Sequence, residues 1–352
     1  EYGFPESHAQ AFAWLAYVSS WLKCRHPAVF TCALLNSQPM GFYAPAQLVR
    51  DAQEHGVDVR PVDVNASHGD CTLEGPAGGP FALRLGFGRI DGFRDAWAGQ
   101  IVQARQNGAF VSAEDLARRA VLPPLALRKL ADADAFGSLG QSRRDALWDV
   151  RRTPPTQLPL FAFAEAPELG SEADAGLPAM DLCEEVVVDY QTARLSLKGH
   201  PMQFLRERLA REGVLTCAET GAAPDGRKVR VAGVVLTRQR PGKGNAVFIT
   251  IEDETGVVNA LLWARDLDKQ RRAVMAARLM LIDGEIQRSK EGVVHLMVAR
   301  VMDRTALLDH LADQDRLVPQ VARGDEIHHP QRPRLHGHPR NVRIVPKSRD
   351  FH

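Results

Sequence analysis

The sequence predicts a multidomain α+β protein, with a mostly helical N-terminal half followed by a C-terminal five-stranded β-barrel. Apolar residues recur at helical spacing through much of residues 8–150. A stretch rich in Pro, Ala, Glu and Gly interrupts the chain at residues 151–180. Beyond it, residues 227–304 hold five strand-like runs around a single helix. These three observations separate a helical region, a linker and a barrel.

Bulk composition narrows the class of protein. A chain of 352 residues, 45% hydrophobic and 25% charged, is typical of a globular protein with roughly two to four domains. No apolar run approaches the ~20 residues of a membrane helix, so we expect no membrane partner. The five cysteines never form a C-x-x-C pair, which argues against a zinc ribbon or disulfide framework and favours the cytoplasm. The chain begins with Glu1, so we expect a fragment or a processed piece.

The first 56 residues predict three helices. Residues 8–35 read as a helical pair that Pro27 divides, and Pro45 and Gly56 mark the start and end of a third helix. Ser7 and His8 stand just before the first helix, which from the residues alone predicts a cap at Ser7 and His8 in the first turn. The expected apolar face of the first helix comprises Phe12, Leu15, Val18 and Leu22.

Residues 57–150 begin with a strand and continue as helices. Residues 57–64 alternate valines with polar residues around Pro61, as an edge strand does. The GPAGGP string that follows is rich in turn residues. From residue 81 to residue 150 we expect helices joined by short hairpins marked by glycine.

The string RIDGFRDAWAGQIVQAR is the first of two helix–hairpin–helix candidates. Gly92 permits a tight turn before a helix whose Trp97, Ile101 and Ala104 share one face. Such hairpins present backbone N–H groups and a helix N-terminus to a DNA phosphate, independently of base sequence. Arg94 stands where these hairpins usually have a second glycine, so we expect weaker phosphate binding here. A plain helical turn without a ligand is the alternative.

The second candidate is LALRKLADADAFGSLGQSRRDAL. Gly137 and Gly140 bracket its hairpin, and Arg143 and Arg144 begin the next helix. These arginines would add a salt-sensitive attraction to DNA phosphates. This hairpin is therefore the better candidate of the two for DNA contact, although it too is compatible with a plain turn.

Residues 151–183 are predicted to be a Pro-rich linker, and they contain the string QLPLF. Exposed Leu158, Leu160 and Phe161 in a flexible segment are unexpected unless they dock into another surface. The string resembles the bacterial sliding-clamp-binding motif, in which Gln157 would make polar contacts and the apolar residues would fill a pocket. The alternative is a linker that folds back onto its own domain.

Residues 184–226 predict a helical connector, and residues 227–305 predict an OB-fold. The strand-like runs are KVRVAGVVLTRQR, AVFITIED, VVNALLW, ARLMLIDGEIQR and VVHLMVARVMDR. A helix at 265–277 lies between the third and the fourth, which is the order of elements in OB-folds.

The expected binding face of this barrel is aromatic and basic. Phe248 alternates with apolar neighbours on the second strand, so it can face a groove, and Trp263 ends the third strand near it. Stacking of a base on such aromatics contributes about 1–3 kcal/mol. Burial of Trp263 in the barrel's own core is an equal alternative. The cations expected to attract phosphates are Arg238, Arg240 and Lys243 in the first loop, and Arg288 and Lys290 in the last hairpin.

No metal site is expected in the chain. The histidines of the basic tail, residues 306–352, lie among Pro and Arg with no ordered element to fix a ligand geometry. The D-x-D pairs at 132/134 and 266/268 are interpreted as solvated acids. Nucleotidyl transfer by two metal ions needs carboxylates held on a rigid scaffold, and no motif of that kind occurs.

Three strings resemble bacterial family C DNA polymerases, the DNA polymerase III α-subunit-like enzymes. YGFPESHAQAFAWLAYVSSWLKCRHPAVFTCALLNSQPMGFY resembles the end of their fingers region, in the form typical of the error-prone branch. QLPLF lies in a linker after the hairpins, where the family carries its clamp peptide. HPRNVRIVPKSRDFH resembles the C-terminus of the error-prone branch. The resemblance covers nearly all of this chain but only the last third of the family's proteins.

The resemblance implies roles for individual segments. Residues 1–56 would end the fingers region, with Ser7 and His8 near the incoming nucleotide or template, and residues 57–150 would be a small β segment plus a helix–hairpin–helix region. The family's catalytic aspartates and Mg²⁺ belong to a palm that precedes the fingers, so we expect no cofactor in this chain and no activity of the chain alone.

The whole enzyme would synthesise DNA from deoxynucleoside triphosphates across lesions. Its partners would be primer-template and single-stranded DNA, the sliding clamp and other translesion-synthesis proteins. Two alternatives remain. One is a stand-alone, non-catalytic OB and helix–hairpin–helix accessory module that binds DNA. The other is an OB-containing nuclease or tRNA-binding protein, which the fingers-like string disfavours.

Overall fold

The computed structural model describes residues 6–40, 43–76, 79–153, 179–241 and 244–312, and the chain divides into two compact units. The first unit comprises Glu1–Gln38, Pro45–Asp181 and Thr192–Leu197, and the second comprises Pro39–Ala44, Leu182–Gln191 and Lys198–His352.

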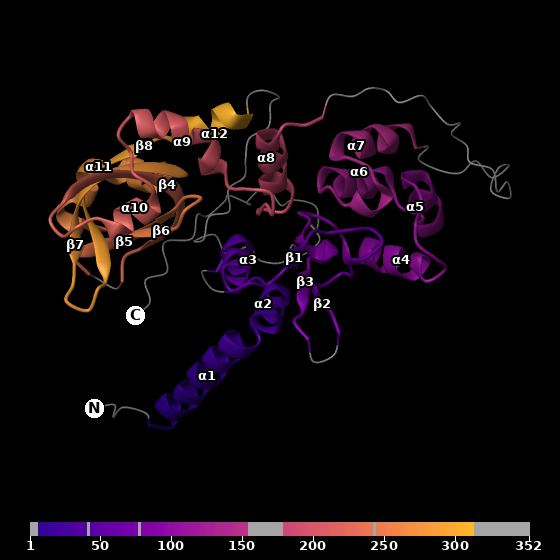
Figure 1. The fold of residues 1–352 in the computed structure, drawn as a ribbon, viewed down its shortest axis with the longest axis horizontal. Coiled ribbons are helices and arrows are strands. Elements are labelled where there is room, and N and C mark those ends of the chain that lie inside the picture. The colour runs from indigo at the N-terminus through magenta and orange to yellow at the C-terminus, as the bar shows by residue number, and fades with distance from the viewer. Residues whose placement is uncertain (1–5, 41–42, 77–78, 154–178, 242–243, 313–352) are drawn as a thin grey trace, which may run out of the picture. The chain divides into compact units, whose positions relative to one another are not determined.

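The first unit is mostly helical, with a small sheet inserted after its third helix (Figure 1). Its α-helices are α1 (Glu6–Arg25), α2 (Pro27–Asn36), α3 (Pro45–Glu54), α4 (Asp95–Arg105), α5 (Ala113–Ala120), α6 (Pro124–Asp132) and α7 (Arg143–Arg152). Its strands are β1 (Val59–Arg60), β2 (Thr72–Glu74) and β3 (Ala82–Arg84), and its short 3-10 turns are η1 (Phe87–Arg89) and η2 (Gly137–Leu139).

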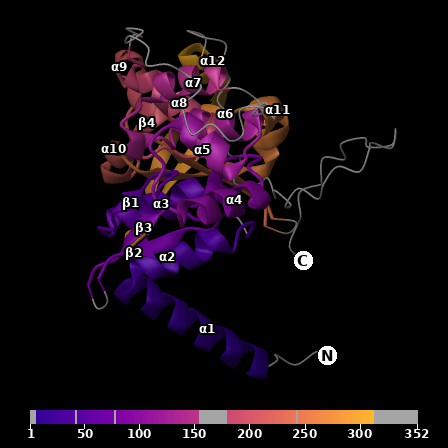
Figure 2. The ribbon, with the colours of Figure 1, turned by 90° about the vertical axis from the view of Figure 1, so that its right-hand side faces the viewer.

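The N-terminal helices follow the predicted pattern, except for the cap and the apolar face of the first helix. The structure confirms the helical pair and its break at Pro27. Because α1 already begins at Glu6, Ser7 lies inside the first turn, and the predicted cap at Ser7 is wrong. Helix α1 projects from the rest of the unit (Figures 1 and 2). The expected apolar face is not buried among the described residues, since Phe12 and Leu15 are each 58% exposed.

The small sheet has the strand order β1-β3-β2. The predicted edge strand is confirmed as β1, which pairs in parallel with β3. Its hydrogen-bonded part is only two residues long. The prediction that residues from 81 onward are helical is wrong at β3, which pairs with β2 in an antiparallel hairpin. Strands of three residues are too short to show a period of two in the sequence.

One hydrophobic core joins the elements of the first unit from α2 to α7. It contains buried side chains on α2, on β3 and on the helices that follow, including Leu35, Leu83 and Leu130. The predicted boundary between residues 56 and 57 therefore does not separate two cores. Leu195, which follows the linker, is buried in the same core.

The second unit is built around a closed barrel of five strands (Figure 1). Its strands are β4 (Lys228–Gln239), β5 (Ala246–Glu252), β6 (Val257–Trp263), β7 (Leu279–Arg288) and β8 (Val294–Asp303). Its helices are α8 (Leu182–Thr192), α9 (Pro201–Arg211), α10 (Cys217–Ala222), α11 (Ala264–Ala276) and α12 (Thr305–Ala312). The barrel order is β4-β5-β6-β8-β7, with α11 between the third and fourth strands. This confirms the predicted OB-fold.

Helices α9 and α10 are held to the barrel by one buried carboxylate. Arg206 on α9 lies 2.6 Å from the Asp253 carboxylate, which also accepts the Cys217 N–H at 2.8 Å. Burial alone would raise the pKa of Asp253, but hydrogen bonds from Thr255 and Cys217 and the charge of Arg206 hold it below its usual range. The turn at Asp253 therefore anchors the segment that enters the barrel.

The cysteines of the described residues are free thiols. Cys32, Cys71 and Cys217 are buried, whereas Cys24 is exposed on α1. Burial raises the pKa of the Cys32 thiol to about 11 and also raises that of Cys217. Within the described residues, no helix is both long and apolar enough to cross a membrane.

Candidate nucleic-acid interface

The first hairpin leads from η1 into α4, and its N-terminal end is open to solvent. Gly92 adopts the left-handed conformation with φ +67°, so the predicted tight turn is confirmed. Trp97 and Ile101 turn inward to the core, as predicted. Arg94 occupies the N-cap position of α4 and makes no side-chain cap, so the first N–H groups of α4 have no side-chain acceptor there. Asp95 is the acid in this first turn.

Arg94 fits this hairpin without backbone strain. Its φ of −94° and ψ of 141° are ordinary extended values, which any residue adopts. The position usually held by a second glycine therefore accommodates a side chain here. The Arg94 guanidinium lies over the Trp97 ring, 4.9 Å from its centroid, in the geometry of a cation–π contact.

A second cation reaches the same hairpin from α6. Lys129 Nζ donates to the Asp91 carbonyl oxygen at 2.6 Å, and a Cβ at Gly92 would lie 3.2 Å from this nitrogen. The segment after the linker also contacts the hairpin, because the Asp91 N–H donates to the Thr192 carbonyl at 2.7 Å. The hairpin therefore holds one lysine and one arginine beside an uncapped helix end.

The second hairpin, η2 followed by α7, has its helix end capped from within. Gly140 has φ +70°, and Ser142 occupies the N-cap position of α7. The Ser142 Oγ accepts the Asp145 N–H at 3.3 Å, which satisfies one of the free N–H groups of the first turn. The predicted hairpin is confirmed, but its helix end already has a partner.

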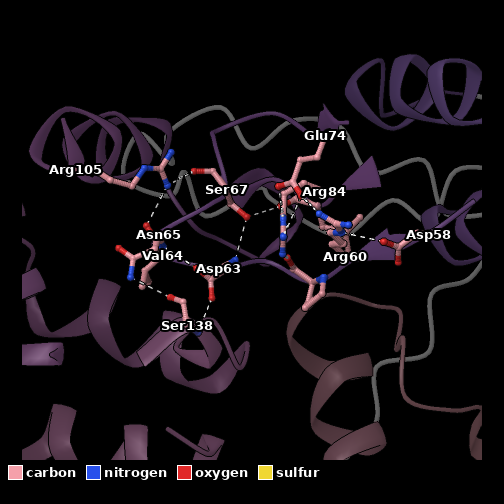
Figure 3. A network of polar contacts seen from close by, with 12 residues as sticks. Asp58, Arg60, Asp63, Val64, Asn65, Ser67, Glu74, Arg84, Arg105 and Ser138 are labelled. Carbon is pink, nitrogen blue, oxygen red and sulfur yellow. Dashed lines mark hydrogen bonds and ion pairs between the residues drawn. The ribbon is translucent and has the colours of Figure 1, made fainter. Parts of the chain in front are cut away.

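The turn of the second hairpin is bound to the loop that follows β1 (Figure 3). The Ser138 N–H donates to the Asp63 carboxylate at 2.8 Å, and Asn65 Nδ2 donates to Ser138 Oγ at 3.0 Å. Asp63 is buried, and its other oxygen accepts the Asn65 N–H at 2.8 Å. Arg105 ties the same loop to α4 by donating to the carbonyls of Val64 and Ser67. A carboxylate of the chain thus takes the hairpin N–H that a phosphate would need.

The two arginines that begin α7 differ sharply in accessibility. Arg143 is only 1% exposed and lies on the inward face of α7 with Ala146 and Val150. A side chain at this depth is not accessible to a DNA phosphate, so the expectation of direct attraction is wrong for Arg143. Arg144 is half-buried and keeps its candidacy.

The outer face of β5 and β6 carries the predicted aromatic residues. Phe248 alternates with buried Val247 and Ile249, and it lies opposite Leu261 on β6. Its ring makes an edge contact with His295 at 6.4 Å between centroids. Trp263 is 42% exposed, so the alternative of burial in the barrel core is wrong. Both aromatic residues therefore face outward.

The predicted cations around this face divide into two groups. Arg238 lies within β4 and donates to the Val274 and Ala277 carbonyls, which caps the last turn of α11. Arg288 donates to the Gly221 and Ala223 carbonyls at the end of α10. These contacts give both arginines a structural role. Arg238 lies in a strand and not in the predicted loop, whereas Arg288 lies in the last hairpin as predicted. Arg240 and Lys290 are exposed, and Lys243 lies outside the described residues.

Several predicted positions stay untested by the structure. His8 is exposed in the first turn of α1, with its ring 4.5 Å from that of Phe12. Gln157, Leu158, Leu160 and Phe161 and the basic tail from residue 313 lie outside the described residues. Within the described part of the chain, no three His, Cys, Asp or Glu residues are grouped as metal ligands.

Two residues that contact the hairpins, Lys129 and Asp63, were not predicted from the sequence. Lys129 is a surface-like position of α6, yet it reaches the first hairpin 38 residues away. Asp63 lies 75 residues from the hairpin N–H that it accepts. Hydrophobic periodicity contains no signal for polar contacts at such separations. Asp132 was also misjudged as simply solvated, since burial raises its pKa.

Family models match both regions that carry the interface. Residues 56–146 match the family described as "Helix-hairpin-helix motif", and residues 229–303 match "OB-fold nucleic acid binding domain". The chain also aligns with an error-prone DNA polymerase of Rhodopseudomonas palustris at 52% identity, over 100% of this chain and 33% of that protein. An error-prone DNA polymerase of Brucella abortus is 53% identical, over 100% of this chain and 32% of its own length.

The chain is homologous to the C-terminal third of the error-prone DNA polymerases. It spans about a third of the length of the curated relatives that it matches. Both family-model matches lie within the part of the chain that aligns with these polymerases.

Two solved structures resemble a smaller part of the chain. The asparaginyl-tRNA synthetase from Pyrococcus horikoshii covers 25% of this chain and 22% of its own, at 26% identity and a TM-score of 0.23. The OBody AM1L10 bound to hen egg-white lysozyme covers 23% of this chain and 80% of its own, at 21% identity and a TM-score of 0.20. Similarity at this level carries no functional argument.

Proposed function

We propose that this chain grips DNA for an error-prone DNA polymerase and tethers that enzyme to the sliding clamp during translesion synthesis. The proposal rests on the homology, which extends over the whole of this chain and about a third of the length of these polymerases. Matches to two nucleic-acid-binding families in the same chain support it. The polymerase reaction itself, with its Mg²⁺ and deoxynucleoside triphosphates, would belong to the rest of the protein.

In the first unit, the geometry favours the first hairpin as the DNA contact. Its helix end is uncapped and exposed, and Lys129 and Arg94 stand beside it. A phosphate placed there would meet backbone N–H groups, the positive end of the α4 dipole and two cations. The second hairpin contributes through Arg144, while its turn is fixed by Asp63.

In the second unit, Phe248 and Trp263 would stack on unpaired bases while Arg240, Lys243 and Lys290 attract the backbone. Replacing Phe248 and Trp263 by Ala should weaken binding of single-stranded DNA by about 1–3 kcal/mol per stacked base. Trp148, which is 43% exposed on α7, provides a control of matched exposure. Fluorescence anisotropy with a labelled oligonucleotide measures the change. Equal losses from the control would contradict the assigned face.

The clamp tether would be the QLPLF string. Leu160→Ala with Phe161→Ala should abolish binding to the purified sliding clamp, because the two side chains would fill its apolar pocket. Phe163→Ala removes a nearby aromatic outside the string and serves as the control. Surface plasmon resonance on immobilised clamp gives the affinities, and unchanged binding by the double variant would exclude this motif.

A primer-extension assay distinguishes a polymerase fragment from a stand-alone accessory module. The chain alone should not extend a primer with Mg²⁺ and nucleotides. Joined to the upstream two-thirds found in its relatives, it should support extension. Extension by the isolated chain would show that catalytic carboxylates lie within it.

A further inference from the structure

A group of cations lies on the barrel outside the aromatic face of β5 and β6. We call Arg227, Lys228, Lys269, Arg272 and Arg300 the basic track. They come from three segments that are distant in sequence. Arg227 and Lys228 lie at the entry to β4, Lys269 and Arg272 lie on α11, and Arg300 lies on β8. All five are exposed, so they are available to a ligand in solution.

The basic track lines two open grooves that meet on β8. The first groove, about 890 Å³, runs between α11 and β8 and is lined by Lys269, Arg272 and Arg300. The second, about 730 Å³, crosses β4, β7 and β8 and is lined by Arg227 and Lys228. Ala299 borders both grooves, so the two grooves are adjacent on the barrel surface.

The floor of the first groove is held in place by a glutamine. Gln270 on α11 accepts the Val301 N–H at 2.6 Å and donates to the Ala299 carbonyl at 3.4 Å. These two bonds fix α11 against β8 along the groove. The cations on either side are therefore carried by regular elements whose spacing is set by the fold.

The cationic side chains in these grooves can interact with a negatively charged ligand. Among the described residues, the five side chains of the basic track form no ion pair or hydrogen bond. Three of the four lining acids are already engaged, by an arginine or by the start of a helix. Asp266 is paired with Arg265, Asp283 with Arg230, and Asp303 accepts both the N–H and the hydroxyl of Thr305. Glu285 is the remaining acid.

The register of the barrel connects the basic track to the aromatic face. One row of outward-facing residues crosses all five strands, and each residue in it is the register partner of the next. The row is Phe248, Leu261, Met297, Glu285 and Lys228. Adjacent strands lie about 4.8 Å apart, so the row spans roughly 20 Å. A ligand that lies on Phe248 can reach Lys228 without leaving the surface.

The lining favours a nucleic-acid backbone over a protein partner. Stable protein interfaces depend on aromatic or large apolar anchors at their centre. No aromatic residue lines either groove, and the large, partly exposed apolar side chains in their lining are Leu215 and Met297. Lysine and arginine without stacking partners suit phosphates, whose recognition is independent of base sequence.

We propose that the basic track continues the path of single-stranded DNA from the Phe248 face around the barrel, holding its sugar–phosphate backbone. This inference rests on the proposed binding of DNA by the aromatic face. It adds a second segment to that path, formed by α11, β8 and β4, which contacts only strands longer than those that cover the aromatic face.

The test compares variants of one helix in the full chain. Lys269→Gln with Arg272→Gln removes two cations of the basic track, and the control Arg271→Gln removes a cation of α11 that lines neither groove. Binding to oligothymidine of roughly 6 and roughly 16 nucleotides is measured over a range of salt concentrations. On the longer strand, the first pair should reduce the salt slope by about 1.4, which is ~0.7 per phosphate. Arg300→Gln should reduce it by about 0.7.

Four outcomes are decisive. Loss confined to the longer strand and to the basic-track variants supports the proposal. A loss from Arg271→Gln equal to that from Arg300→Gln, or no loss from Lys269→Gln with Arg272→Gln, overturns it. Equal loss on a blunt duplex also overturns the single-strand assignment. Phe248→Ala is measured on the shorter strand, so failure of the aromatic face is detected separately from failure of the basic track.

Discussion

The two hairpins of the first unit share a left-handed glycine and a following helix, yet their helix ends differ in what they leave available. In the second hairpin, Ser142 caps α7 and Asp63 accepts the Ser138 N–H. In the first, Arg94 leaves α4 uncapped and Lys129 stands at the turn. One hairpin has its polar groups satisfied from within, and the other presents them to solvent. A shared motif therefore does not imply a shared role.

The largest expected effect concerns the buried arginine of the second hairpin. Arg143→Ala should lower the free energy of unfolding by roughly 3 kcal/mol, because it removes a buried charge that neighbours the partly buried Asp132. Arg144→Ala, one residue along the same helix, should change it by less than about 0.5 kcal/mol. Chemical denaturation measures both. Similar values for the two variants would show that Arg143 is not structural.

Asp63 carries the next largest effect. Asp63→Ala leaves the N–H groups of Ser138 and Asn65 without an acceptor, and charged hydrogen bonds of this kind contribute about 1.5–3 kcal/mol. Asp58→Ala, at an exposed carboxylate nearby, is the control (Figure 3). If thermal unfolding shifts equally for both, the second hairpin does not depend on its internal carboxylate.

A matched pair of glycine substitutions separates stability from DNA binding. Gly92→Ala and Gly140→Ala both place a side chain at positive φ and should each cost about 1 kcal/mol. At Gly92 the new Cβ also meets Lys129 Nζ, whereas at Gly140 nothing lies within 4 Å. We expect weaker duplex DNA binding only for Gly92→Ala. Loss of affinity at Gly140 alone would reverse the assignment of the hairpins.

The smallest expected effect is a pH dependence at Asp132. Burial raises the pKa of this carboxyl above its ordinary value of about 3.8. Its contribution to stability is therefore fully present below that value and is lost as the pH rises through the folded-state pKa. Asp132→Asn should flatten the decline in stability above about pH 4. Urea unfolding across the acid range gives the slopes, and an unchanged profile would rule out Asp132 as the titrating group.

The elements of the fold were largely predictable because they follow from short-range patterns. The break at Pro27, the turn at Gly92 and the order of strands around α11 all have local signals in the sequence. Arg143 had a signal that was not used, since it shares a helical face with Ala146 and Val150 at spacings of three and seven. Arg143 was expected to attract a DNA phosphate because it is charged, although its position on the helix indicated burial.

The candidate site was less predictable because its decisive contacts are long-range. Arg238 lies in a basic segment of the sequence, but its side chain donates to a carbonyl at the end of α11. No sequence pattern indicates that these two groups are close in space. The basic track likewise depends on the barrel register, which brings Lys228 and Met297 onto one row through Glu285. Pairing of strands distant in sequence converts scattered cations into one surface.

The buried cysteines allow local opening of each unit to be measured separately. A thiol must be accessible and ionised to react with an alkylating reagent, so Cys32 and Cys71 are protected while the first unit stays closed, and Cys217 while the second does. Their rates of modification give the free energy of local opening for each unit separately. Cys24, exposed on α1, reacts without opening and sets the intrinsic rate. The native chain thus allows the two units to be followed independently while DNA is bound.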